Sequence, residues 1–220
     1  MKRLMFPVFF VIMLVFAISI ASAQRAENLD LSFFLGMKDG SESSEGVIVS
    51  FIVEEPDDKT TTVFEEHWVE QEWSDEFVVP LNEWGGETIT LNLTTDPGLT
   101  RNTGWDWILI GDARITADDD LVFDIGQAVA SGMQEVSILV DGQDEEEKGL
   151  GFGANCQSDG GTVGGETKPK SFMQHPPWDG AVGNTISRYE IELPPAVGAQ
   201  AVDATGKLAT TWARIREYKL

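Results

Sequence analysis

The 220-residue chain contains a single cysteine, Cys156, and only two histidines, His67 and His175. One cysteine cannot form a disulfide within the chain, so the fold must rest on its apolar core. The two histidines have no metal-ligand spacing, and no serine or cysteine occupies a nucleophile-elbow motif. Cys156 lies in a glycine-rich stretch without a recognisable base nearby, and we interpret it as structural. These absences predict that the protein is not an enzyme.

Acidic residues are abundant, so a glycosidase with two carboxylates is the catalytic alternative that composition leaves open. The neighbouring pairs Glu54 and Glu55, and Glu65 and Glu66, fall within predicted strands. Adjacent residues of a strand point to opposite faces of the sheet, so neither pair can share one site.

Basic residues are scarce: 15 lysines and arginines stand against 37 acidic residues, for a formal net charge of −22. A chain this negative repels phosphate backbones and anionic lipid, which argues against nucleic acid and membrane-surface partners. The charge suits neutral, cationic or basic partners.

No long hydrophobic run follows residue 23, so we expect no membrane insertion of the mature protein. The first 23 residues have the pattern of a signal peptide: Lys2 and Arg3, then an apolar run, then Ala21-Ser22-Ala23. Cleavage before Gln24 is predicted, with a retained membrane anchor as the alternative. The expected location is secreted, periplasmic or on the cell surface.

Helical periodicity is scarce, and alternation with period two dominates from residue 29 to residue 115. Leu29, Leu31, Phe33 and Leu35 predict one half-buried strand that ends at Gly36. Further strands are expected at residues 46–53, 61–72, 77–79, 87–94, 105–110, 121–123, 136–140 and 185–193. Short strands separated by turn residues predict an all-β fold, an antiparallel β-sandwich of the jelly-roll kind.

We divide the mature chain into three parts. Residues 27–117 form the first part of the sandwich, and residues 118–195, with strands and a glycine-rich loop at 154–170, are expected to complete it. Residues 125–133 could hold one or two helical turns.

Residues 196–220 form a C-terminal tail that predicts a short helix, because Leu208, Trp212 and Ile215 fall at helical spacing. The tail is basic on an acidic protein, and it either docks on the parent surface or frays. Its basic residues are Lys207, Arg214, Arg216 and Lys219.

Three motifs between residues 31 and 115 resemble those of a known class of domain. Residues 33–40 (FFLGMKDG) resemble a strand ending in G-x-x-D-G, and residues 77–91 (FVVPLNEWGGETITL) resemble its V-x-L edge with an aromatic before glycine. Residues 96–98 (DPG), with 106–107 and 111–115 (GDARI), resemble its closing strand. The class is that of galactose-binding-like jelly rolls, of the carbohydrate-binding-module type found beside secreted glycoside hydrolases.

Residues 172–178 and 183–194 look like the opening strands of the same kind of sandwich, yet here they follow the strand at 33–40. Either the chain is a circularly permuted single sandwich, or it joins the back half of one module to the front half of another. Because termini of compact domains often lie close together, permutation is physically accessible.

The resemblance implies a non-catalytic protein that binds a neutral glycan or cell-surface polysaccharide through exposed aromatics, on which sugar rings stack. Trp178, held between Pro177 and Asp179, is the first candidate, with His175 in the same segment. Trp68 and Trp73 lie on a strongly charged segment and are further candidates, whereas Trp107 is expected in the core. A structural or adhesive cell-surface protein that binds another protein is the alternative function.

A structural calcium ion is the expected cofactor, because sandwiches of this class often hold one with aspartate and loop carbonyl oxygens. Four aspartates lie at predicted strand ends near glycine and are its candidate ligands: Asp39, Asp96, Asp106 and Asp112. Residues 118–120 (DDD) are interpreted as a solvated linker.

Overall fold

The computed structural model describes residues 25–98, 102–140, 143–144, 156–177 and 183–199. The predicted signal peptide at 1–23, Trp178, and the tail from residue 200 onward lie outside the described residues. Within the described chain, no helix is long and apolar enough to cross a membrane.

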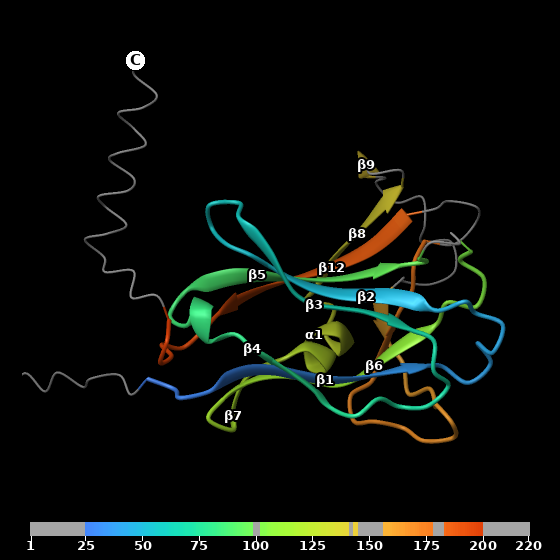
Figure 1. Ribbon diagram of the computed structural model, residues 1–220, viewed down its shortest axis with the longest axis horizontal. Coiled ribbons are helices and arrows are strands. Elements are labelled where there is room, and N and C mark those ends of the chain that lie inside the picture. The colour runs from blue at the N-terminus through green and yellow to red at the C-terminus, as the bar shows by residue number, and fades with distance from the viewer. Residues whose placement is uncertain (1–24, 99–101, 141–142, 145–155, 178–182, 200–220) are drawn as a thin grey trace, which may run out of the picture.

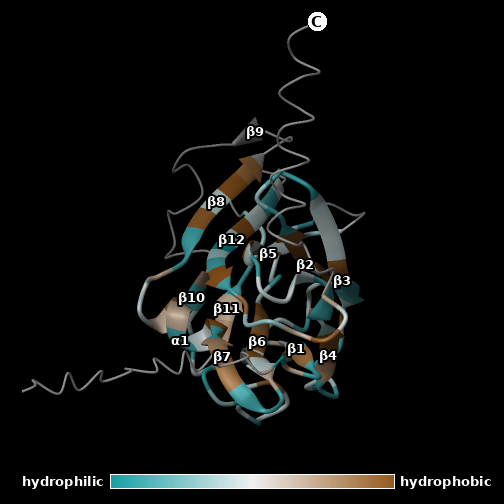
Figure 2. Ribbon diagram, turned by 90° about the vertical axis from the view of Figure 1, so that its left-hand side faces the viewer, coloured by the Kyte–Doolittle hydropathy of each residue, from teal (hydrophilic) through white to brown (hydrophobic). Residues whose placement is uncertain are grey.

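Two antiparallel sheets pack face to face, which confirms the predicted all-β sandwich (Figures 1 and 2). Sheet 1 has the order β10-β11-β6-β1-β4, with β7 also paired to β6. Its strands are β1 (Leu29–Met37), β4 (Phe77–Pro80), β6 (Ile108–Ala117), β7 (Asp120–Asp124), β10 (Cys156–Ser158) and β11 (Phe172–Gln174).

Sheet 2 has the order β3-β2-β5-β12-β8-β9. Its strands are β2 (Val47–Glu54), β3 (Thr60–Trp68), β5 (Thr88–Asp96), β8 (Glu135–Val140), β9 (Gln143–Asp144) and β12 (Gly183–Glu192). Two short helices complete the described elements, the 3-10 helix η1 (Asn82–Trp84) and the α-helix α1 (Ile125–Ala130).

The period-two residues of β1 form one wall of the core. Leu29, Leu31, Phe33 and Leu35 are all fully buried against the other sheet. Removing apolar surface from water contributes roughly 25 cal/mol per Å², so this interleaving of two apolar faces is the main source of stability. Packing of this core thus stabilises a chain that cannot form an internal disulfide.

Residues from the late part of the chain complete both sheets. β12 pairs with β5 from Thr185 to Glu192, so the late strand lies beside a strand of residues 27–117, as its alternating apolar residues predicted. β11 pairs with β6 in sheet 1. The two sequence segments therefore share one hydrophobic core.

Buried polar side chains join the two sheets across part of this core. The amide of Gln174 on β11 donates to the carbonyl oxygens of Leu93 (2.9 Å) and Thr185 (3.2 Å) in sheet 2. Its oxygen accepts a bond from the Ser187 hydroxyl at 2.7 Å, and Ser187 accepts one from the Tyr189 hydroxyl at 3.1 Å. We call these side chains the Gln174 network.

Two predicted strands differ from the structure by more than two residues at one end or both. The strand expected at 61–72 ends at Trp68, and the next residues run along the edge of β1 toward β4, where Glu70 accepts the Met37 amide and Ser74 bonds to the backbone of Leu35. The strand expected at 105–110 begins only at Ile108, because Trp105 has the left-handed φ of +67° and breaks the extended chain. The predicted helical turns at 125–133 form α1.

The two long sides of the sandwich are closed differently. α1 begins at the N-cap Asp124, whose carboxylate accepts the amide of Gln127, and it buries Ile125 and Val129 beside β6 and β10. On the opposite side, the edge strands β3 and β4 face one another without a helix between them in the described chain (Figure 2).

Candidate functional site

Loops from both sheets meet at the end of the sandwich where β1 ends and β6 begins. The amide of Lys38, just after β1, donates to the carbonyl oxygen of Trp107, just before β6, at 2.9 Å. A Cβ placed on Gly40 would lie 3.8 Å from the Trp107 ring. We call this loop cluster the Trp105 end.

Trp105 and Trp107 form an aromatic pair at this end. The Trp107 amide donates to the Trp105 carbonyl at 2.8 Å, which closes a tight turn around Asp106. The two indole centroids lie 5.2 Å apart in an edge-to-face arrangement. Trp105 is 50% exposed, whereas Trp107 packs against Leu109 and Val163. The result is an exposed indole supported by a second indole that is anchored in the protein.

Asp106, between the two tryptophans, turns its side chain into the protein and is 1% exposed. One carboxylate oxygen accepts the Ser44 hydroxyl at 2.6 Å, and the other has no hydrogen-bond partner among the described residues. Burial, joined by the negative charge of Glu45, raises the pKa of Asp106 to about 6, against the opposing effects of the Ser44 bond and His67. The site therefore contains a buried carboxyl group whose pKa is raised well above that of an exposed aspartate.

His67 is exposed at the end of β3 and lies next to the loop that carries Ser44. A ring nitrogen of His67 lies 3.1 Å from the carbonyl oxygen of Glu45. Gly46 has a φ of +99°, and a Cβ there would lie 2.6 Å from the same nitrogen. Glycine at this position therefore permits the close approach of the imidazole to the loop.

Asp39 was predicted as a calcium ligand, and the structure surrounds its carboxylate with protein donors instead. The amides of Gly164 and Gly165 donate to it at 2.7 and 3.0 Å, and the Thr162 hydroxyl donates as well. These bonds lower the pKa of Asp39. The residue joins the turn after β1 to the glycine-rich loop that precedes β11.

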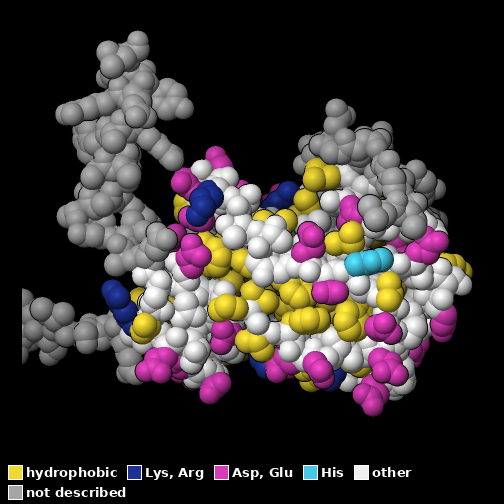
Figure 3. Space-filling model, in the orientation of Figure 1, with side chains coloured by type: hydrophobic (Ala, Val, Ile, Leu, Met, Phe, Trp, Pro, Cys, Tyr) yellow, Lys and Arg dark blue, Asp and Glu magenta, His cyan; other side chains and the backbone are white. Residues whose placement is uncertain are grey.

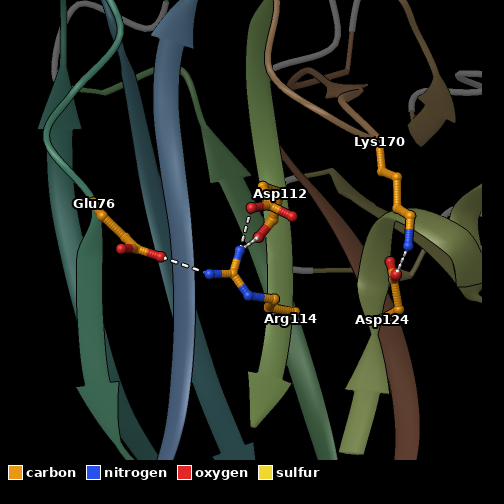
Figure 4. A network of polar contacts seen from close by, with 5 residues as sticks. All are labelled: Glu76, Asp112, Arg114, Asp124 and Lys170. Carbon is orange, nitrogen blue, oxygen red and sulfur yellow. Dashed lines mark hydrogen bonds and ion pairs between the residues drawn. The ribbon is translucent and has the colours of Figure 1, made fainter. Parts of the chain in front are cut away.

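Asp112, another predicted ligand, lies on β6 and forms an ion pair with Arg114 (Figure 4). Arg114 also pairs with Glu76 at 2.9 Å, while Lys170 pairs separately with Asp124 at the end of β7. Each cation in this group thus already has a carboxylate of the protein beside it.

Asp96 ends β5, and its carboxylate accepts the amide of Gly98 at 2.7 Å. The four aspartates are not brought together, and within the described ranges no three His, Cys, Asp or Glu side chains form a group that could hold a metal ion. Calcium binding stays a prediction without a site in the described part of the chain.

The predicted aromatic candidates Trp68 and Trp73 are both half-buried. Trp68 packs against the core and lies edge-on to Phe77 at 6.2 Å. Trp73 lies on the outer face of sheet 1 beside Val163, and its ring N–H donates to the Glu166 carbonyl at 3.1 Å.

The other two candidates belong to the segment after β11. His175 is buried, with a ring nitrogen 2.7 Å from the Pro176 carbonyl oxygen, and burial lowers its pKa. Trp178 lies outside the described residues.

A pocket of about 540 Å³ lies at the opposite end of the sandwich. Its lining includes Arg25, Val197 and the carboxylates of Glu27, Asp30, Asp118 and Asp119. The Asp118 carboxylate accepts the amides of Glu27 and Asn28 at 2.8–3.1 Å, so it fixes the start of the chain against the β6–β7 turn. Partial burial raises the pKa of Asp30.

Cys156 lies in the core rather than in an accessible loop. It is 1% exposed, and its sulfur lies 4.0 Å from the Tyr189 hydroxyl. Burial raises the pKa of its thiol to about 11, so the nucleophilic thiolate is not formed near neutral pH.

Sequence analysis did not identify Trp105 as a site residue, and it named Asp106 as a calcium ligand rather than as a buried carboxyl beside an exposed indole. An apolar run from Trp105 to Ile110 resembles a buried strand, and a left-handed φ at a tryptophan has no signature in composition. The available signal was Gly104 after Asn102 and Thr103, a turn-forming sequence directly before Trp105.

Comparison with protein-family models, with curated proteins and with solved structures gave no match for this chain, so it is assigned to no family.

Proposed function

We propose that the mature protein binds a neutral glycan at the Trp105 end and does not cleave it. The observation that carries the proposal is Trp105 itself, an indole that is half exposed and supported from one side by Trp107. Pyranose rings stack on aromatic faces of this kind, and a ring that is already held in place loses little entropy on binding.

Polar groups in the surrounding loops suit hydroxyl recognition. The exposed Asn102 and the half-buried Thr103 precede the turn, and the half-buried Ser44 lies beneath it, where its hydroxyl donates to the buried Asp106. A sugar site needs only a few such groups to fix the orientation of its ligand. The negative charge of the chain favours a neutral glycan over an anionic one.

The non-catalytic part of the proposal rests on the chemistry of the described groups. The thiol of Cys156 is buried and protonated near neutral pH, and the sequence contains no nucleophile-elbow motif. The predicted signal peptide would deliver this binding protein to the cell exterior, where glycans are its accessible partners.

Replacement of the indole tests the proposal directly. A neutral-glycan array on the mature protein selects an oligosaccharide, and titration calorimetry then compares wild type with Trp105→Ala. Stacking contributes on the order of 1 kcal/mol or somewhat more per ring, so affinity should fall about tenfold.

Leu121→Ala is the matched control. Leu121 is 59% exposed on β7, so this substitution truncates an apolar side chain about as accessible as Trp105 but away from the Trp105 end. Equal affinity of wild type and Trp105→Ala for every glycan that binds would contradict the proposal. Binding of no neutral glycan would favour the alternative, an adhesive protein that recognises another protein.

A further inference from the structure

An apolar seam runs along the open side of the sandwich, between the edge strands β3 and β4. Phe64 and Trp68 on β3 and Phe77 on β4 are half-buried there and pack against the core. Figure 3 shows the seam as a band of hydrophobic side chains across the face of the molecule. We define the seam by these three residues.

The seam is continuous with the aromatic core beneath it. Phe64 lies 4.9 Å from Phe33 and 4.8 Å from Phe77, in both cases edge-on. Rigid rings at an exposed position provide apolar area at low cost in conformational entropy, which is a property of contact surfaces. On the opposite side of the sandwich, α1 packs beside β6 and β10 and buries Ile125 and Val129 in the core.

An acidic residue lies within this apolar seam. Glu66 is opposite the buried Val49 in the strand register and therefore shares the inner face of β3 with Phe64 and Trp68, yet its side chain is exposed. The segment from Glu65 to Glu76 carries six carboxylates and no lysine or arginine. The chemistry of the seam therefore fits an apolar occupant flanked by positive charge.

The C-terminal segment of the same chain has this chemistry. Leu208, Trp212 and Ile215 recur at the spacing of one helical face. Four basic residues accompany them between 207 and 219, against two acidic residues, Asp203 and Glu217, in the whole segment 200–220. It is a positively charged segment on a chain whose net charge is −22.

The described chain ends near the residues that follow β4, one of the two strands that border the seam. The amide of Asn82, two residues beyond β4, donates to the carbonyl oxygen of Val197 at 3.0 Å. From residue 199 to residue 207 an extended chain covers roughly 25 Å. The nine residues of β3 span about 30 Å. The segment can therefore reach the seam from its own chain.

We propose that residues 207–219 dock along the β3–β4 seam of the same molecule. The apolar face of the segment covers Phe64, Trp68 and Phe77, and its basic side chains pair with Glu66 and the neighbouring carboxylates. Docking would cover the unpaired edges of both sheets, which exposed edge strands otherwise present to other chains. The inference is independent of glycan binding.

Intramolecular cross-linking of the mature full-length protein tests the docking. A carbodiimide joins lysines to adjacent carboxylates, and peptide mass spectrometry locates the products of Lys207 and Lys219. The expected partners are carboxylates between Glu65 and Glu76. Trp212→Ala should reduce the yield about tenfold, because it removes the largest apolar contact of the segment.

A charge exchange makes the test specific for the seam. Arg214→Glu with Arg216→Glu, or Glu66→Lys alone, should each lower the yield several-fold, and the three changes together should restore much of it. Asp120→Lys is the matched control, since Asp120 is equally exposed on the distant β7 and should neither lower nor restore the yield.

Three results would overturn the proposal: cross-links spread over all acidic surfaces, cross-links confined to the pocket that contains Asp30, or a yield that rises with protein concentration. The last would show that the segment contacts a second molecule instead.

Discussion

Two buried polar sites in this protein differ in how their hydrogen bonds are satisfied. Gln174, fully buried between the sheets, uses its amide nitrogen and its oxygen to bond groups of β5 and β12. Asp106, 99% buried at the Trp105 end, uses one oxygen for Ser44 and has no partner for the other among the described residues. Both are polar groups removed from water, yet only one is fully paired.

The difference separates a structural role from a functional one. A paired buried amide costs little and fixes the relative position of two sheets, whereas an unpaired buried oxygen lowers stability by on the order of 1–3 kcal/mol. Groups that lower stability and do not help to hold the fold together are concentrated at functional sites. The comparison therefore supports placement of the binding site beside Asp106 rather than beside Gln174.

The largest effect is expected from loss of the Gln174 network. Gln174→Ala removes three hydrogen bonds across the sandwich and leaves a cavity, so the free energy of unfolding should fall by about 3–5 kcal/mol. Urea denaturation of the mature protein measures this change. Gln174→Met is the control, because it retains most of the volume and removes only the polar atoms; it should cost about half as much. Equal losses in the two variants would show that the hydrogen bonds alone matter at this site, and no loss in Gln174→Met would show that packing alone matters.

The second effect concerns pH. In the folded state the pKa of Asp106 is about 6, against a usual value of 3.8, so the folded protein retains a proton that the unfolded chain releases. Stability from this group is therefore present at pH 4 and is lost as pH rises to 6, by up to about 3 kcal/mol. Charged groups that act on Asp106 are Glu45 and His67.

Asp106→Asn isolates this contribution, because asparagine keeps an oxygen for Ser44 and does not titrate. The variant should match wild type near pH 4 and exceed it in stability near pH 7. Urea midpoints measured at several pH values provide the comparison. A constant difference between the two proteins from pH 4 to pH 7 would rule out a raised pKa for Asp106.

A smaller change is expected at the other end of the Gln174 network. Tyr189→Phe removes a hydroxyl that donates to Ser187 and lies near Cys156, without leaving a large cavity. The free energy of unfolding should fall by about 1 kcal/mol. Combination with Gln174→Met in a double-mutant cycle should give less than the sum of the two losses, since both act on Ser187. Strict additivity would show that the bonds are independent.

Most strands could be predicted from the sequence because apolar residues that face the core alternate with residues that face outward. Leu29 to Leu35 in β1 and Tyr189 to Leu193 at the end of β12 are period-two runs, and each falls where the pattern predicts a strand, whereas Ile186 is out of phase and only half-buried. Burial of one face requires that period, so the inference is direct. The short strand β10 was not predicted, since three residues in a glycine-rich region carry no detectable period. β11 lies within residues 172–178, where only the resemblance to a sandwich strand suggested one.

The candidate site was less accessible to sequence reasoning because it depends on contacts between distant loops. Asp39 was chosen for its position beside glycine, and its actual partners, Thr162 and Gly164, lie more than 120 residues away. The exposure of Trp68 and Trp73 depends on which side chains pack against them, and a charged sequence context does not determine this. Trp105 was missed because its backbone conformation arises from the loop.

The smallest effect on stability is expected at Trp105, and it distinguishes the two kinds of site most clearly. Half of the indole is exposed and its backbone has a left-handed φ of +67°, which costs a non-glycine residue about 1 kcal/mol. Trp105→Ala loses a partly exposed contact with Trp107 and should change the free energy of unfolding by less than about 1 kcal/mol. Trp105→Gly removes the backbone strain and should be at least as stable as the alanine variant. Thermal melts of the two variants beside wild type measure the ranking.

A loss of more than about 2 kcal/mol in Trp105→Ala would assign the residue to the core, because truncation of a packed tryptophan costs that much or more. Near-constant stability together with a tenfold loss of glycan affinity would identify Trp105 as a residue that serves binding alone, in contrast to Gln174, which serves the fold.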